Sequence, residues 1–207
     1  MKAVLFISLL ASVVLSACTG NTSKQNTHTV SEYILNEIWS TDTIMRTPES
    51  VLYDEVRDVL YVANMNLNPQ VPGSKGFISR LSTTGEVLDL EWIKEIREPK
   101  GMGIFGNLLY VTAVTELVII DLDEGKIVQN IPVDSAVFLN DLAIDATGLV
   151  YFTDSRKGKI HTFKDGVVRE WITGLSSPNG LYSEESRVLL ATSSFNSVNP
   201  ETGLVSM

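Results

Sequence analysis

The chain has 207 residues, 44% of them hydrophobic, and its 25 acidic and 16 basic residues give a net charge of −9 at pH 7. This composition is sufficient for a packed core and excludes a mainly disordered chain. Binding to nucleic acid needs clustered Lys and Arg, whereas the basic residues here are scattered, so we expect no nucleic-acid partner.

Residues 1–17 resemble the signal peptide of a bacterial lipoprotein. The apolar run Ala3–Leu15 follows Lys2 and is too short to span a bilayer comfortably, and Leu15-Ser16-Ala17-Cys18 is similar to a lipobox. Cys18 is the only cysteine, which fits a lipid anchor better than a disulfide or a catalytic nucleophile. The alternative is an ordinary secretory signal with an incidental cysteine.

Residues 18–30 are rich in Asn, Thr and Ser and are predicted to be a polar tether between the lipid on Cys18 and a folded domain. We therefore expect a protein that is anchored in the bacterial cell envelope, at the outer membrane.

Residues 31–207 contain four stretches that follow one template of two short strands. Each has an alternating strand, a turn and a nearly continuous apolar strand, and the starts at residues 48, 99, 139 and 178 recur with a period of about 40. In the third stretch, Asp145-Ala146-Thr147-Gly148 has the Asp and Gly that a type I turn prefers. The stretches are Pro48–Asn64, Pro99–Ala113, Leu139–Asp154 and Pro178–Thr192.

Hairpins follow the first three stretches, at residues 77–90, 117–131 and 159–171, so each unit has four strands, as in the blade of a β-propeller. No stretch after residue 30 has a helical period, and an additional outer strand is expected at Glu32–Trp39. We predict an all-β fold with about four blades. Closed propellers usually have about four to eight blades, so the chain is expected to be a truncated part of a larger propeller.

The first strand of every blade lines the central channel, so the second residue of each unit is expected to reach one point there. Those residues are Glu49, Lys100, Asn140 and Asn179. Carboxylate and amide oxygens are the ligands that Ca²⁺ or another hard divalent cation takes, and we predict a metal site formed by Glu49, Asn140 and Asn179. Each Asn could instead only cap a turn, because Asn bonds its own backbone there.

Lys100 opposes this metal, because an ammonium 4 Å from a positive charge costs roughly 4 kcal/mol per unit charge pair at an effective dielectric of about 20. It is expected either to contact a substrate or to face the solvent. Asp154 ends the second strand of its unit near the same mouth, where it is expected to orient a substrate. Its alternative interpretation is a turn residue at the end of a strand.

Three of these motifs, Leu139–Asp145, Tyr151–Ser155 and Ser177–Leu181, resemble the family of the senescence marker protein (regucalcin), gluconolactonase and the luciferin-regenerating enzyme. The likeness covers roughly residues 45–195. It implies a six-bladed propeller with a divalent cation in its channel, and several members hydrolyse sugar lactones or related esters.

The resemblance implies that Glu49 and Asn179 bind the metal and that Asn140 contacts substrate or metal. A further acid of the family, which also serves as general base, is expected beyond Met207, so the catalytic residue is unknown here. The family's substrate-binding Arg falls on Phe138, which departs from the usual recognition of sugar lactones.

We expect a metal-dependent lactone or ester hydrolase; the alternative is a non-catalytic propeller that binds a ligand or a protein partner. The chain has only two histidines, His28 in the tether and His161 in a predicted third strand, which argues against a Ser-His-Asp site.

Overall fold

The computed structural model describes residues 34–67, 75–185, 187–192, 197–198 and 205–206. The predicted signal peptide, Cys18 and the tether at 18–30 lie outside the described residues. The chain divides into two compact units, Met1–Asn36 and Glu37–Met207, and the fold below is that of the second unit. The part of the chain that the structure describes is without helices, so no membrane-spanning helix occurs in it.

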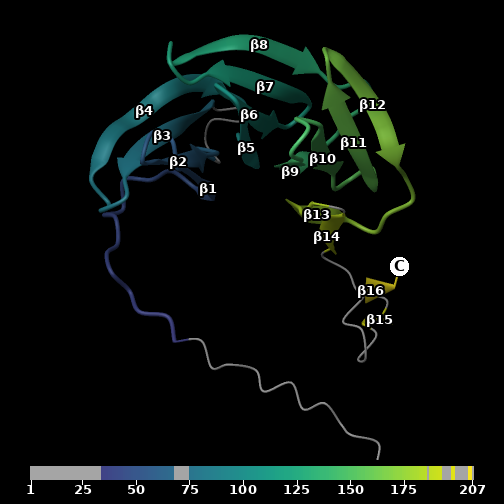
Figure 1. Cartoon of the computed structure of the whole chain (residues 1–207), viewed down its shortest axis with the longest axis horizontal. Coiled ribbons are helices and arrows are strands. Elements are labelled where there is room, and N and C mark those ends of the chain that lie inside the picture. The colour runs from purple at the N-terminus through teal and green to yellow at the C-terminus, as the bar shows by residue number, and fades with distance from the viewer. Residues whose placement is uncertain (1–33, 68–74, 186, 193–196, 199–204, 207) are drawn as a thin grey trace, which may run out of the picture. The chain divides into compact units, whose positions relative to one another are not determined.

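The described strands form an all-β fold of antiparallel sheets, and within each sheet every strand pairs with the next along the chain (Figure 1). Three sheets are four-stranded and form complete blades, and β13–β14 begins a fourth. Blade 1 contains β1 (Pro48–Asp54), β2 (Val59–Asn64), β3 (Gly76–Ser82) and β4 (Val87–Ile96). Blade 2 contains β5 (Met102–Phe105), β6 (Leu108–Ala113), β7 (Glu116–Asp121) and β8 (Lys126–Pro132).

Blade 3 contains β9 (Leu139–Ile144), β10 (Val150–Asp154), β11 (Lys159–Lys164) and β12 (Val167–Ile172). The fourth sheet contains β13 (Pro178–Ser183) and β14 (Val188–Thr192), and a short pair follows, β15 (Ser197–Val198) and β16 (Val205–Ser206). The first strands β1, β5, β9 and β13 contact one another in this order and lie innermost in Figure 1. The predicted all-β propeller architecture is therefore confirmed, with about four blades.

The core lies between neighbouring blades, because the middle strands are buried on both faces. Tyr61 and Ile78 of blade 1 pack against Val111 of blade 2, and Leu117 of blade 2 belongs to a second cluster with Phe152 of blade 3. In the outer strands β8 and β12, by contrast, most residues are exposed. The continuous apolar runs of the sequence thus mark strands that lie between two sheets.

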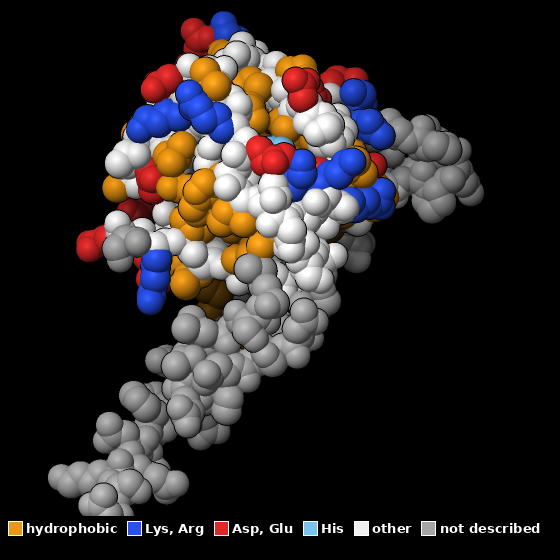
Figure 2. All heavy atoms as spheres, turned by 90° about the vertical axis from the view of Figure 1, so that its right-hand side faces the viewer, with side chains coloured by type: hydrophobic (Ala, Val, Ile, Leu, Met, Phe, Trp, Pro, Cys, Tyr) orange, Lys and Arg blue, Asp and Glu red, His pale blue; other side chains and the backbone are white. Residues whose placement is uncertain are grey.

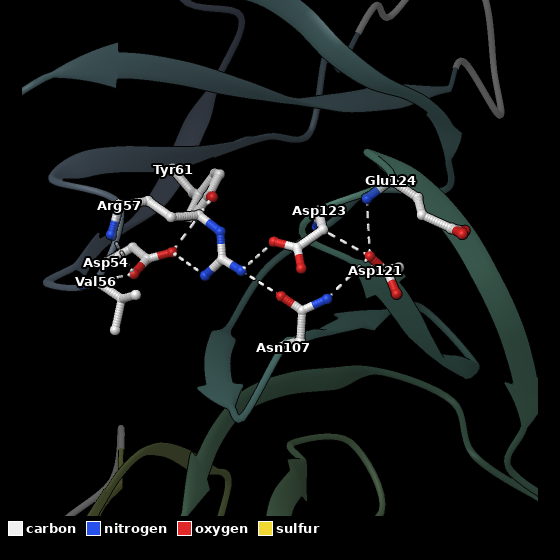
Figure 3. Close-up of polar contacts among 8 residues, drawn as sticks. All are labelled: Asp54, Val56, Arg57, Tyr61, Asn107, Asp121, Asp123 and Glu124. Carbon is white, nitrogen blue, oxygen red and sulfur yellow. Dashed lines mark hydrogen bonds and ion pairs between the residues drawn. The ribbon is translucent and has the colours of Figure 1, made fainter.

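A polar network joins turns of blades 1 and 2 at the end where β1 finishes (Figure 3). Arg57 contacts Asp54 of its own blade at 3.1 Å and Asp123 in the β7–β8 turn at 2.7 Å, and it also donates to Asn107 in the β5–β6 turn. Asn107 in turn donates to Asp121 at 3.1 Å. Arg57 therefore ties blade 1 to blade 2 at the end of β1 remote from Glu49.

The prediction of a strand at Glu32–Trp39 is wrong for the described part of this segment, because residues 34–39 form no strand. Trp39 instead donates its indole N–H to the Thr83 carbonyl at 3.0 Å and lies over Gly85 in the β3–β4 turn. An alternating pattern produces a strand only where a partner strand is available for hydrogen bonding, and here a single large side chain makes the contact.

Candidate functional site

Near the start of each inner strand after β1, one main-chain carbonyl accepts a hydrogen bond from a hydroxyl group of the preceding blade. The Thr153 hydroxyl on β10 donates to the Asn179 carbonyl at 3.0 Å, and Thr112 on β6 donates in the same way to the Asn140 carbonyl. In blade 1 the equivalent position of β2 is Ala63, and the Ser50 hydroxyl on β1 donates to the Lys100 carbonyl at 2.5 Å instead. The starts of β9 and β13, and Lys100 two residues before β5, are thereby fixed at one mouth of the channel.

Glu49 lies near the start of β1 with an exposed side chain. Loss of solvation on one side raises the pKa of its carboxyl group, the neighbouring Asp141 carboxylate raises it further, and Lys100 lowers it. Asp141 and Lys100 therefore act on the Glu49 carboxyl group with opposite electrostatic effects. Glu49 therefore has a negative and a positive neighbour at this mouth.

Lys100 does not face the solvent, because only 2% of it is exposed. Its Nζ donates to the Glu98 carbonyl at 3.0 Å, lies 3.5 Å from the Glu98 carboxylate and lies 4.6 Å from the centre of the Phe138 ring. Burial lowers the pKa of Lys100, against the opposing effects of Glu98 and Glu49. The ammonium is thus a buried cation with partners in its own blade and in the β8–β9 loop.

Asn140 is buried, with 7% exposed, and its two amide atoms differ in their environment. Nδ2 donates to the Ser155 hydroxyl at 3.1 Å, and this hydroxyl donates onward to the Pro178 carbonyl at 2.5 Å. Oδ1 is buried and accepts no hydrogen bond from the described residues. A buried acceptor with no partner is rare in folded proteins.

Asn179 lies at the start of β13 with an exposed side chain, and it lines a pocket of about 570 Å³ together with Asn140. The remaining walls come from the loops that precede β9, β11 and β13. The structure therefore brings the two predicted amides into one cavity. Glu49 and Lys100 interact electrostatically but do not line this cavity.

Asp154 is completely buried, and both of its oxygens accept backbone N–H groups. Oδ2 accepts from Val137 at 2.8 Å, and Oδ1 accepts from Phe138 and Lys157, both at 3.1 Å. The geometry assigns Asp154 to holding the β8–β9 and β10–β11 loops in place. These loops carry Phe138 and frame the pocket, so Asp154 acts on the site through the backbone.

Asp141 is a site residue that the sequence reasoning missed. Its Oδ2 accepts the Leu181 N–H at 2.8 Å, and Oδ1 lies so close to Gly101 that a Cβ there would approach it to 2.6 Å. Burial raises the pKa of this carboxyl group, although hydrogen bonds from Leu181 and Leu142 lower it. The sequence did contain a sign of this role. Asp141 is the third residue of its repeat, and the third residues of the neighbouring repeats are Gly101 and Gly180, which leave room for its side chain.

The Asn140 and Asn179 amide oxygens and the Glu49 and Asp141 carboxylates are hard donors of the kind that a divalent cation takes, but only the two amides line the same pocket. The described residues contain no group of three His, Cys, Asp or Glu side chains that could hold a metal. A metal here would therefore depend on amide oxygens, with Lys100 as an unfavourable neighbour.

No protein-family model and no curated protein matches the chain. Among solved structures, it is similar to a gluconolactonase from Xanthomonas campestris, with a TM-score of 0.56 and 13% identity over 70% of this chain and 54% of that one. A putative gluconolactonase has a TM-score of 0.55 at 16% identity, covering 70% and 55%. The hydrazine synthase of Kuenenia stuttgartiensis has a TM-score of 0.58 at 16% identity, covering 81% and 47%. The chain thus spans about half the length of these structures, and the likeness shows the fold.

Proposed function

We propose that this chain belongs to the gluconolactonase-like propellers and that the complete protein, six-bladed, hydrolyses a lactone or ester with the help of a divalent cation. The likeness to two gluconolactonase structures supports the choice of family. The observation that carries the proposal is that Asn140, whose buried Oδ1 accepts no hydrogen bond from the described residues, shares a pocket with Asn179.

The residues that would hold the cation, which we take to be Ca²⁺, are Glu49, Asn179 and Asn140. When bound, such an ion polarises a substrate carbonyl and lowers the pKa of a water molecule. The Nδ2 hydrogen bond to Ser155 fixes the orientation of the Asn140 amide. Asp154 holds the loop before Asn140, and Asp141 adds negative charge beside Glu49.

Lactone hydrolysis by the full-length protein, measured with and without a chelator, tests this function. Glu49→Gln removes a charged ligand and is expected to reduce kcat/KM by at least the roughly 10- to 100-fold that a lost supporting group costs a metal site. Glu55→Gln, an exposed acid in the β1–β2 turn, is the matched control and should leave the rate unchanged. Hydrolysis that is insensitive to both the chelator and Glu49→Gln would refute the proposal.

A second candidate is a propeller that binds a ligand or protein partner without catalysis. The buried ammonium of Lys100 beside Glu49 favours it, because that charge opposes a cation. The third similar structure, a hydrazine synthase, also shows that this fold is not restricted to lactonases. Calorimetry distinguishes the two candidates: Ca²⁺ binding without turnover supports the binder.

We also propose that the protein is anchored in the outer membrane by a lipid on Cys18. The lipobox-like segment supports this. Metabolic labelling with a fatty acid is expected to mark the full-length protein but not Cys18→Ser, and equal labelling of both would contradict the anchor.

A further inference from the structure

His161 is a buried titratable group that takes no part in the candidate site. Only 4% of it is exposed, and in the strand register it lies opposite Phe152 on β10 and Glu170 on β12. The imidazole stacks on the Phe152 ring, with the ring centres 5.4 Å apart and the planes inclined by 21°. The buried Nε2 atom has no hydrogen-bond partner among the described residues. The imidazole is therefore packed as an apolar ring would be.

The surroundings of His161 are an apolar layer between two complete blades. Phe152 and Phe163 belong to the cluster in which blades 2 and 3 meet, whereas Ile160 belongs to the next cluster along the chain. Because side chains alternate along a strand, His161 faces blade 2 together with Phe163. An imidazolium ion here places a charge in this layer and gives Nε2 a proton without an acceptor, and both effects cost free energy.

The charged groups around His161 do not compensate for its burial. Burial lowers the pKa of the imidazole, Asp154 on β10 and Glu170 on β12 raise it, and Lys159 lowers it. Glu170 is paired with Lys159, and both oxygens of Asp154 already accept backbone N–H groups. From blade 2 the cluster contributes one titratable side chain, Tyr110, whose hydroxyl group stays neutral because burial raises its pKa.

Asp154 connects His161 to the loops around the candidate site. Its carboxylate accepts three backbone N–H groups, two from the β8–β9 loop and one from the β10–β11 loop. Residues of both loops line the pocket that Asn140 and Asn179 share. Asp134, the acid within the β8–β9 loop, is exposed. A positive charge on His161 thus acts on the acid that holds these loops in place.

We infer that His161 is an acid-sensitive switch between blades 2 and 3: when the imidazole takes up a proton, the interface at Phe152 loosens and Asp154 releases the two loops. The neutral imidazole keeps the pocket assembled, and the protonated one opens it. This response goes beyond the proposed function, because it does not depend on what the pocket binds or on whether it catalyses a reaction.

The direction of the response follows from the lowered pKa of His161. The unfolded chain binds this proton more readily than the folded chain, so the contribution of His161 to stability is complete above 6.5, the ordinary pKa of histidine. It is lost progressively as the pH falls below that value toward the lower pKa of the folded state.

Proton NMR titration of the imidazole rings measures the uptake directly, because the chain has only two histidines, His28 and His161. The spectrum of His28→Gln assigns the two signals. His161 is expected to titrate below 6.5, and a midpoint at or above that value would overturn the inference. This titration uses the parent ring and therefore decides the matter even where a substitution of His161 prevents folding.

Amide hydrogen exchange at about pH 7.5 and about pH 5.5, corrected for the intrinsic pH dependence of exchange, locates the response. At the lower pH the Val137 and Lys157 amides, which donate to Asp154, are expected to lose roughly tenfold or more of their protection. The strands β2 and β3 of blade 1 should keep theirs.

His161→Phe retains a ring against Phe152 but cannot take up a proton, so this variant is expected to lose the response. His28→Gln is the matched control and should keep it. Undiminished protection in the parent at the lower pH, the same loss in His161→Phe, or an equal loss in all blades would each contradict a switch at His161.

Discussion

Lys100 shows how a single buried charge shapes the mouth of the channel. Its 2% exposure removes the ammonium from water, and one carbonyl, one carboxylate and one aromatic ring replace that solvation only in part. Because its pKa is lowered, the unfolded chain holds the proton more tightly than the folded one. The folded state therefore bears a cost at all pH values below 10.5, the ordinary pKa of lysine, and the cost diminishes as the pH rises toward that value.

Lys100→Met keeps much of the side-chain volume and removes the charge. We expect it to raise the free energy of unfolding by about 1 kcal/mol or more at pH 7, with a smaller gain near pH 10. The same variant should bind Ca²⁺ more tightly than the parent, since one opposing charge near Glu49 is lost. Urea denaturation at the two pH values and calcium calorimetry measure these effects, and a loss of stability at pH 7 would contradict this account.

At the scale of elements, the contacts between blades depend on a few hydroxyl groups. Thr153 is completely buried, accepts the Asp141 N–H at 3.1 Å and donates to the Asn179 carbonyl at 3.0 Å. It therefore connects β10 to the inner strand of its own blade and to that of the next. No apolar side chain of the same shape can make both bonds.

Thr153→Val is expected to lower the free energy of unfolding by about 1–3 kcal/mol, because two buried backbone groups lose their partner. Thr173→Val, in the exposed β12–β13 loop, should change it by less than about 0.5 kcal/mol. Chemical denaturation of both variants is the measurement. Equal stability of the two would show that the hydroxyl contributes little.

Most strands could be predicted from the sequence, because a strand between two sheets needs an unbroken apolar run and an outer strand needs alternation. The turn at Asp145–Gly148 is found as predicted, with Gly148 N–H bonded to the Asp145 carbonyl at 2.9 Å. The error at Glu32–Trp39 arose because alternation is local, whereas strand pairing depends on a distant partner.

The candidate site was less predictable than the strands. Asn140 and Asn179 occupy the same place in neighbouring repeats and line one cavity, as expected from register, whereas Glu49 and Lys100 occupy that place too but do not line it. The burial of Lys100 and the position of Asp141 depend on contacts with other blades, namely the Phe138 ring and the space beside Gly101. Such contacts have no signature in the sequence of a single blade.

For the second unit as a whole, the sheet β13–β14 has exposed apolar side chains. Tyr182 is 64% exposed and Leu189 is 42% exposed, and β14 pairs only with β13 among the described strands. Figure 2, which views the molecule from the side of β12, shows hydrophobic side chains gathered between charged ones on the side turned to the viewer. Apolar surface beside an unpaired strand favours association with other chains.

We expect the 207-residue chain to self-associate and Leu189→Lys to reduce this association. Val128→Lys is the control. Val128 is similarly exposed, at 47%, on β8 of a complete blade, and its substitution should not alter the self-association. Sedimentation analysis over a range of protein concentrations measures the effect. A parent chain that stays monomeric throughout would contradict this expectation.

The hydrogen bonds from Thr112 and Thr153 to the following blade have an evolutionary consequence. Both hydroxyls bind a main-chain oxygen, at Asn140 and at Asn179, and a carbonyl is present whatever the side chain is. The scaffold thus specifies where a functional group projects without specifying which group it is. Mutation can exchange acid, amine and amide at these positions while the framework persists, so new chemistry can arise on this architecture without redesigning it.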